Sequence, residues 1–327
     1  MDWNKGWESK YYASIVDRTT WRDIDRFEIT GGRISRTPKE LRESADIDTT
    51  NYMLGETWVR IWMDVFQDGA NDHVPMFTGL ATSPAENHDG NLVSNTLECY
   101  SVLKPLQNIL LPRGWYARKG TGRVILEDLL SVTPAPVEIA DNVPNIKQHI
   151  IAEGGETHLS MLDKVLLALD WRIRITGNGV IHVMPHPTDI SGEYSTTNDA
   201  VEPRFTKECD WYGCPNVFRA VSGDESAVAV DNSDSEISVL SRGREVWAED
   251  NNASLKDGET LYEYALRRLE EEQLVAKKIN YSRRYNPNII VGDLVRFNYS
   301  QIQGTYYVLS QNIELGYDCT TNEEAVK

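Results

Sequence analysis

The sequence is poor in cysteine, and the four that it has are scattered. Cys99, Cys209, Cys214 and Cys319 include no Cys-x-x-Cys pair. So few thiols cannot form a disulfide framework in a chain of 327 residues, and we expect them to stay reduced. Because Cys209 and Cys214 lack a second ligand pair at zinc-site spacing, we interpret them as structural residues rather than metal ligands.

Long apolar runs are also missing. No stretch approaches the roughly 20 apolar residues that a membrane-spanning helix needs. The opening residues, MDWNKGW, contain no apolar signal core. We therefore expect a protein that is made and folded in a cytoplasm and does not insert into a membrane.

Basic residues are outnumbered by acidic ones, 33 against 50, which gives a net charge of −17. This sign disfavours binding to nucleic-acid phosphates or to an anionic membrane surface. An acidic wall would, however, let DNA pass without adhering to it. The charge therefore predicts no specific nucleic-acid binding and weakly favours a conduit for DNA.

Motifs of catalytic and metal sites are absent from the sequence. His149, His158, His182 and His186 fall close together but form neither His-x-x-x-His nor His-Glu-x-x-His. The sequence has no Gly-x-Ser-x-Gly elbow and no glycine-rich loop long enough to cradle a phosphate. We predict no catalytic residue, no cofactor and no metal site.

A pair of carboxylates could still act as in a glycosidase. With 50 acidic residues in the chain, chance pairs are unavoidable. The run Glu270-Glu271-Glu272 more simply forms a solvated helix face, and the polar run 231–236 lacks the order of a calcium loop.

The first hundred or so residues are patterned as short strands. Residues 57–65 alternate with the period of two that a sheet requires, so one set of side chains faces a core. The other set, Trp58, Arg60, Trp62 and Asp64, faces a wetter environment or another subunit. We expect strands at 11–16, 26–34, 57–65 and 95–103, with turns at 31–32, 68–69 and 89–90, and hence a small antiparallel β-barrel domain over 1–104.

The pattern changes near residue 105. Residues 123–130 predict a short amphipathic helix with Val124 on its apolar face, and residues 157–169 predict a second helix capped by Thr157. Two alternating runs around Gly177-Asn178-Gly179 predict a β-hairpin over 171–184. These elements form a helix-hairpin middle domain over 105–201.

Strands return from residue 202 onward. We expect strands at 216–221, 226–230 and 244–248, with the polar run 231–236 as an exposed hairpin tip. Residues 260–281 predict the longest helix, which would cover one face of a barrel. Further strands over 289–299 and 304–315 would complete a second β-barrel domain, 202–327. The expected fold class is therefore mainly β with some α: two small antiparallel barrels and a helix-plus-hairpin middle module.

Two passages carry a resemblance to a known family. One is VGDLVRF at 291–297 with YYVLS at 306–310; the other is the passage 162–185, which ends in WRIRITGNGVIHVMP. Together with the order of elements over nearly the whole chain, they resemble the baseplate hub, or tail-tip hub, proteins of phage tails and tailocins. The motifs themselves are moderately specific, since G-D-L-V-x-F also occurs in unrelated small barrels.

The resemblance implies a non-enzymatic structural subunit of a virion. Such hubs are homotrimers in which two similar barrels per chain make a pseudo-sixfold ring that adapts a hexameric tail tube to a trimeric tip. The implied partners are other copies of the chain, a tail tube or distal tail protein, a tape-measure protein, and a tip spike or fibre protein, with DNA passing through the lumen.

We predict subunit contacts at the strand edges of the two barrels rather than at the polar loops. Aromatic residues there could instead form a sugar-binding platform, as in a receptor-binding tail-tip module, and a peptidoglycan hydrolase is a third reading. Large amphipathic rings more often pack in cores or subunit contacts. The predicted interface residues are Trp58, Arg60, Trp62, Arg296, Tyr306 and Tyr307, and the platform would add Trp211 and Tyr212.

Overall fold

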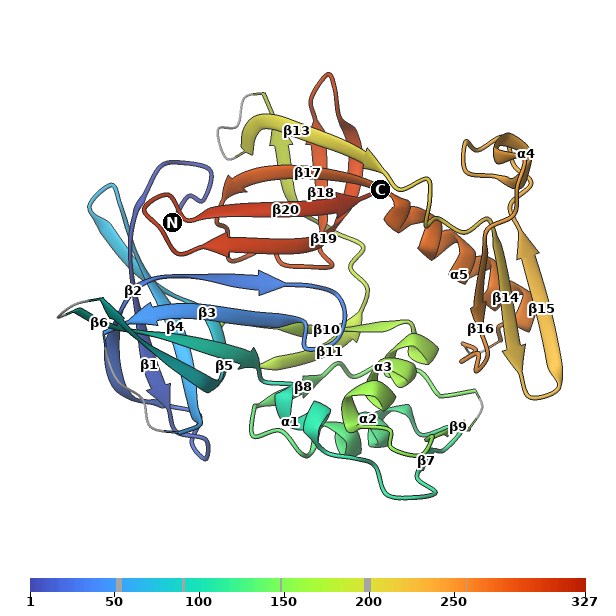
Figure 1. Cartoon of the computed structure of the whole chain (residues 1–327), viewed down its shortest axis with the longest axis horizontal. Coiled ribbons are helices and arrows are strands. Elements are labelled where there is room, and N and C mark those ends of the chain that lie inside the picture. Colours follow the sequence, from blue (N-terminus) through green and yellow to red (C-terminus); the bar gives the residue numbers. More distant parts are fainter. Residues whose placement is uncertain (51–54, 90–91, 148, 197–200, 257) are drawn as a thin grey trace.

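The computed structural model describes residues 1–50, 55–89, 92–147, 149–196, 201–256 and 258–327. Over this part the chain is mainly β with five helices, which confirms the prediction of a mainly β protein with some α-helix (Figure 1). None of these helices is long and apolar enough to cross a membrane. Four parts lie along the chain, and we call them the first unit, the middle module, the second unit and the insert.

The first unit is a closed circuit of six antiparallel strands. The strands pair in the order β1-β4-β5-β6-β3-β2, and β2 pairs back onto β1. Val59, Ile61, Met63 and Val65 on β4 are fully buried, as their alternation predicts. The strands are β1 (Glu8–Val16), β2 (Asp23–Arg36), β3 (Glu43–Thr49), β4 (Thr57–Gln67), β5 (Ala70–Asp89) and β6 (Leu92–Ser101).

The middle module packs two helices against a small sheet. Both predicted helices are confirmed, and the side chain of Thr157 caps α3 by accepting from the backbone N–H of Ser160, 3.2 Å away. Val124 is 63% exposed, so its predicted place on the apolar face was wrong; Ile125 faces the core instead. The elements are α1 (Lys104–Asn108), β7 (Tyr116–Ala117), α2 (Gly122–Leu130), β8 (Val137–Ile139), β9 (Ile150–Ile151), α3 (His158–Leu169), β10 (Trp171–Ile175) and β11 (Ile181–Pro185).

The second unit also has six strands. They pair in the order β13-β17-β20-β19-β18-β12, around a core rich in aromatic rings that includes Tyr281 and Phe297. The strands are β12 (Ile190–Ser195), β13 (Val201–Cys209), β17 (Lys277–Arg284), β18 (Leu294–Asn298), β19 (Gln303–Glu314) and β20 (Thr320–Val326). The strand β12 comes from the range that the sequence assigned to the middle domain.

The two units repeat one order of connection. We count the strands of each unit from first to sixth along the chain. In both units the strands then pair in the order first, fourth, fifth, sixth, third, second. Two differences remain. The pairing of first with fourth is antiparallel in the first unit and parallel in the second, and among the described residues β12 and β13 do not pair to close the second circuit.

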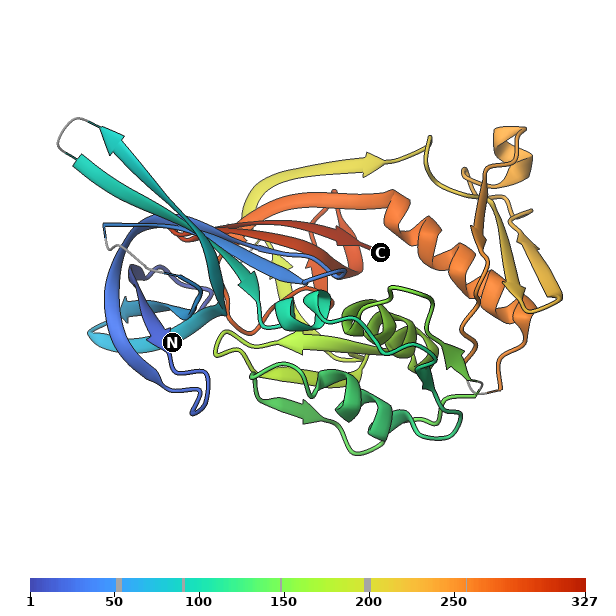
Figure 2. The same cartoon turned by 60° about the horizontal axis from the view of Figure 1, so that its bottom comes forward.

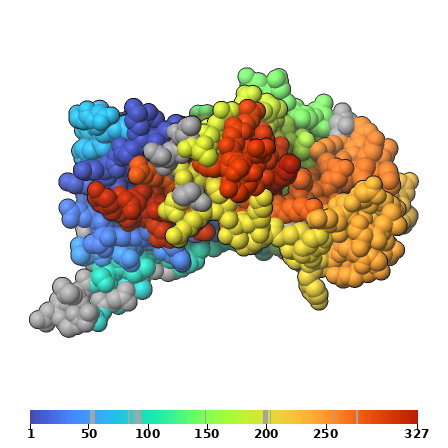
Figure 3. Space-filling view, turned by 90° about the horizontal axis from the view of Figure 1, so that it is seen from above, coloured from blue at the N-terminus to red at the C-terminus, as the bar shows by residue number. Residues whose placement is uncertain are grey.

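The insert lies between the second and third strands of the second unit, and Figure 3 shows it at the far end of the molecule from the first unit. A three-stranded sheet of order β15-β14-β16 is covered on one face by α5, with Phe218, Tyr264 and Leu269 in their shared core. Its elements are β14 (Val217–Ser222), β15 (Glu225–Val230), α4 (Val239–Arg242), β16 (Trp247–Asp250) and α5 (Leu261–Ala276).

Three predictions about this region were wrong. The long helix ends at Ala276, and residues 277–281 belong to β17, where Ile279 and Tyr281 alternate into the core of the second unit. The helix covers the small sheet of the insert, not a barrel face. The run 231–236 follows β15, and the hairpin tip is at 223–224, where Gly223 has the positive φ of 61° that a tight turn uses.

Candidate functional site

The first and second units are joined edge to edge, and we call this joint the seam. The last residues of β2 pair with the second half of β19, from Arg36 opposite Gln311 to Arg33 opposite Glu314. The first half of β19 pairs with β18 instead. One edge of β19 therefore pairs within its own unit over the first half and across the seam over the second half, while its other edge pairs with β20.

A buried polar network crosses the seam. The Arg36 guanidinium donates to the carbonyl oxygen of Met76 at 2.5 Å and to Oε1 of Gln311 at 3.3 Å. Gln311 Nε2 donates in turn to Oε1 of Glu323 at 2.5 Å. Arg283 holds the same carboxylate through Nε at 2.9 Å and Nη2 at 2.5 Å, with side chains only 1% and 0% exposed. Of these contacts, the Arg36–Gln311 hydrogen bond joins the two units, and the others lie within one unit. Because buried charges are costly without partners, the network favours the packing that keeps all of them paired.

Glu43 adds a titratable group to the seam. Its carboxylate lies 3.4 Å from Nε of Arg36, and its other oxygen, Oε1, has no partner in the part of the chain that the structure describes. Burial raises the pKa of Glu43 to about 7, although Arg36 opposes the rise. The side chain therefore changes charge near neutral pH.

The middle module docks on the outside of the first unit through its hairpin turn. Arg60 Nη2 donates to the carbonyl oxygen of Asn178 at 3.1 Å, and Thr78 Oγ1 donates to that of Gly177 at 2.7 Å. A Cβ on Gly177 would lie 1.8 Å from the carbonyl oxygen of Pro75, so only glycine fits there. Figure 2 shows the hairpin (light green) reaching from the module toward the first unit.

This docking corrects the predicted subunit contact for two residues. Arg60 is 6% exposed and pairs with Asp23 at 2.5 Å, while Trp58 is 9% exposed and belongs to the buried cluster of the middle module. The outward alternation of these residues was predicted correctly. Another part of the same chain covers them, because the hairpin turn, more than a hundred residues further along the sequence, packs against the first unit.

Trp62 stays near the surface and takes part in a stack of three side chains. Its ring lies parallel to that of Tyr12, with centroids 6.2 Å apart, and the guanidinium of Arg26 lies 3.4 Å from the centre of the Tyr12 ring. Trp62 Nε1 donates to Asp23 at 2.8 Å. The stack gives the first unit an ordered amphipathic outer face, which keeps Trp62 as a predicted contact.

Of the three interface residues predicted in the second unit, one is buried and two lie at the surface. Tyr306 is 9% exposed and packs edge-on against Phe297 in the core, so it is not a surface contact. Arg296 is exposed and pairs with Glu193 at 2.9 Å, and Tyr307 is 38% exposed. Arg296 lies on the fourth strand of its unit, as Trp62 does on the fourth strand of the first.

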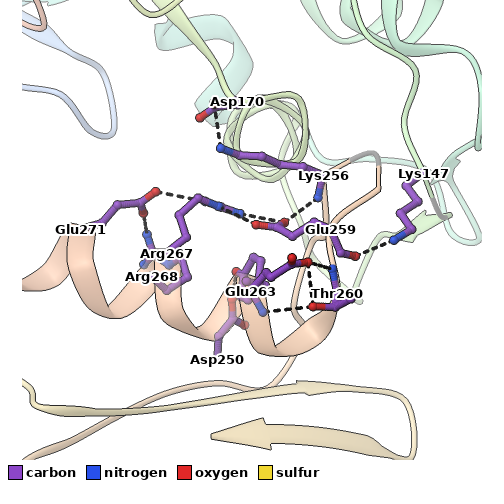
Figure 4. Close-up of polar contacts among 11 residues, drawn as sticks. Lys147, Asp170, Asp250, Lys256, Glu259, Thr260, Glu263, Arg267, Arg268 and Glu271 are labelled. Atoms are coloured by element: carbon purple, nitrogen blue, oxygen red, sulfur yellow. Dashed lines mark hydrogen bonds and ion pairs between the residues drawn. The ribbon is translucent and has the colours of Figure 1, made fainter. Parts of the chain in front are cut away.

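Ion pairs hold the insert against the middle module at the start of α5 (Figure 4). Lys256 Nζ lies 2.7 Å from Oδ2 of Asp170, and Lys147 Nζ donates to the carbonyl oxygen of Glu259 at 2.5 Å. The Arg267 guanidinium binds the carboxylate of Glu259 at 2.8 Å. On the predicted solvated face of this helix, Arg267 thus binds the segment of the insert that contacts the middle module.

Two strand edges have no partner strand among the described residues. Beyond Ala81, the strand β5 runs on through 83–89 and pairs there with β6 only. The strand β13 pairs with β17 along one edge and with nothing along the other. Figure 2 shows the β5–β6 ribbon (teal) projecting from the first unit and β13 (yellow) running along the top of the second. Such edges are ready to pair with another chain.

No group of three or more His, Cys, Asp or Glu side chains that could hold a metal ion is found over the described ranges. No known protein-family model matches the sequence, and no curated protein matches it.

Solved structures do share the fold. A tail protein from Neisseria meningitidis superposes with a TM-score of 0.69 at 15% identity over 97% of this chain and 97% of that one. A 43 kDa tail protein of prophage MuSo2 from Shewanella oneidensis gives 0.68 at 12% identity over 98% of both chains. A component of the type VI secretion system of E. coli, described as similar to the T4 bacteriophage tail proteins gp27 and gp5, gives 0.52 at 9% identity over 92% of this chain and 74% of that one. The chain therefore has the fold of phage tail proteins.

Proposed function

We propose that this protein is a structural hub at the tip of a phage tail or related particle, in which three copies close into a ring with pseudo-sixfold symmetry. The shared strand order of the two units supports this, together with the tail-protein fold over nearly the whole chain. Three chains with two equivalent units each would place six similar bodies around one axis. We assign the protein no catalytic activity.

The observation that carries the proposal is the seam within one chain. There, the second half of a fifth strand (β19) pairs with a second strand (β2). The seam does not use the two strands in the corresponding positions: the fifth strand of the first unit, β5, and the second strand of the second unit, β13. These two have the unpaired edges, over 83–89 and along Val201–Cys209. Repeating the seam between chains would join β13 of one copy to β5 of the next.

A closed ring uses every such edge once. A head-to-tail contact that does not close would grow into a filament, and unpaired edges left in water invite aggregation. Closure after three chains consumes three β5 edges and three β13 edges. A closed ring therefore leaves no such edge open, and the number of three follows from the two units per chain and the pseudo-sixfold symmetry that we propose.

The ring suggests partners on each side. A sixfold face suits a hexameric tail tube or a distal tail protein, and a threefold face suits a trimeric spike or fibre. The lumen would hold the end of a tape-measure protein and later pass DNA, for which the net charge of −17 gives a wall that does not bind the polymer. We place the protein in the virion, at the tail tip.

Cross-linking between copies tests the ring. In a Cys209→Ser background, Glu86→Cys on β5 and Glu208→Cys on β13 are introduced into one chain and treated with a short bismaleimide. Both side chains are exposed. We expect a ladder on a denaturing gel that ends at three linked chains, because a trimer offers no fourth neighbour.

A matched control replaces Glu208→Cys with Glu225→Cys, an exposed residue on β15 of the insert. This pair should give far less cross-linking. Equal ladders for the two pairs, or products that extend beyond three chains, would contradict the ring.

A further inference from the structure

An open pocket of about 540 Å³ lies where the first unit meets the second. Its wall combines the start of β1, the β4–β5 turn, the end of β17 and the β19–β20 turn. The volume falls in the range of roughly 300–1,000 Å³ that small-molecule sites occupy. The seam network lies apart from it, since none of its four side chains lines the pocket.

Three aromatic rings line the pocket: Trp7, Phe66 and Tyr317. Trp7 is held edge-on by Trp3, with ring centroids 5.9 Å apart, and its buried Nε1 has no acceptor among the described residues. Phe66 is 39% exposed and Tyr317 is 78% exposed. The exposed rings of Phe66 and Tyr317 therefore offer an apolar surface to a ligand.

The charged side chains of the pocket have no partners. Glu8, Asp68, Asp318 and Arg284 all line it. Over the described ranges, none of these four makes an ion pair or a side-chain hydrogen bond, unlike the paired charges of the seam. A Cβ on Gly6 would lie 3.2 Å from Nη1 of Arg284, so the glycine leaves room for the guanidinium beside the wall.

The loops that carry these groups are fixed in place. Asp68 and Gly69 both have positive φ, 50° and 80°, as a tight hairpin turn requires. Gln67 accepts from the backbone of Asp2 at 2.8 Å, which ties the N-terminal segment to this turn. Tyr11 donates its hydroxyl to the carbonyl oxygen of Gly316 at 2.9 Å, which holds the opposite turn. The pocket is therefore formed before any ligand arrives.

We infer that this pocket binds a neutral saccharide. An anion would meet three carboxylates, and a simple cation would pair with these carboxylates but leave the donors of Arg284 unused. A sugar satisfies both kinds of group, because its hydroxyls donate to the carboxylates and accept from Arg284, while the apolar face of its ring packs on Tyr317 or Phe66. The inference needs only one chain and does not rest on the proposed ring.

Titration of the full chain with defined sugars tests this. Chitotriose, which has the backbone of bacterial cell-wall glycan, is compared with maltotriose and with a rhamnose–galactose disaccharide by saturation-transfer NMR and tryptophan fluorescence. Choline and inorganic phosphate serve as cationic and anionic probes. We expect at least one sugar to bind with Kd of about 1 mM or tighter. Which sugar binds would separate a cell-wall source from a surface polysaccharide.

Variants assign the binding to the pocket. Tyr317→Ala and Asp318→Asn alter exposed positions and should each weaken binding about tenfold or more with an unchanged circular dichroism spectrum. Tyr212→Ala is the control, because Tyr212 is 87% exposed on a segment outside the pocket. The inference is overturned if no sugar in the panel binds, if only choline or phosphate binds, or if Tyr317→Ala binds as tightly as Tyr212→Ala.

Discussion

Removing the carboxylate of Glu323 should destabilise the protein more than almost any other single charge removal. Glu323 accepts two hydrogen bonds from Arg283 and one from Gln311 in a site that water does not reach. Burial would lower the pKa of Arg283, but Glu323 outweighs it and the net direction is upward, so the guanidinium stays charged. The variant Glu323→Gln leaves that charge buried beside a neutral amide.

The expected cost is about 3–5 kcal/mol in the free energy of unfolding, the range found when one partner of a buried ion pair is removed. Replacing both partners, as in Arg283→Met with Glu323→Leu, should cost far less, because no buried charge is left unpaired. In the pair Arg33–Asp46, Nε lies 2.9 Å from the carboxylate, as it does in Arg283–Glu323, but the two side chains are 62% and 41% exposed. Asp46→Asn should therefore cost less than about 1 kcal/mol.

Urea unfolding followed by tryptophan fluorescence measures these differences. The order of the free energies of unfolding matters as much as their values. Glu323→Gln should have the lowest, the double variant should lie well above it, and Asp46→Asn should lie close to the parent protein. If Glu323→Gln and Asp46→Asn cost the same, Arg283 and Glu323 are not held as buried partners, and the buried network beside the seam does not stabilise the second unit.

Three further predictions concern the joints and surfaces of the protein. The pKa of Glu43 is raised from 4.5 to about 7 in the folded state, so folding favours its protonated form and stability falls as pH rises from about 4.5 to 7. Glu43→Gln should remove this fall, which amounts to about 1–3 kcal/mol in the free energy of unfolding measured with urea over a pH series. Gly177→Ala should lower the thermal midpoint and speed proteolysis of the hairpin, since its Cβ would meet the Pro75 carbonyl, whereas Gly154→Ala, with nothing within 4 Å, should do neither. Trp62→Ala should reduce the share of trimers in native mass spectrometry while costing about 1 kcal/mol of stability or less; an unchanged share removes Trp62 from the subunit contact.

Local signals in the sequence predicted the elements that local physics determines. The helix α3 was found because Thr157 caps it and its apolar residues recur at helical spacing, and the β10–β11 hairpin because Asn-Gly favours its turn. The strand β3 was missed. Two of its four inward residues, Ile47 and Thr49, are β-branched, but the other two are Ala45 and the acid Glu43, and its outward residues are polar, so the strand signal is weak.

What depends on distant contacts could not be predicted in the same way. Arg60 alternates outward on its strand, and no property of its neighbours in the sequence indicates that Asn178 will cover it. The seam joins Arg36 to Gln311, 275 residues apart, and the pocket draws on four separate segments. The repeat of strand order between the units is a property of pairing rather than of residue type, so it became visible only once the pairings were known.

Electron cryo-microscopy of the assembled tail tip tests the central claim most directly. We expect three copies around the axis, with six similar β-units and with β13 of each copy lying beside residues 83–89 of the next. A different number of copies, or copies that touch through the insert while both strand edges stay open to water, would contradict it.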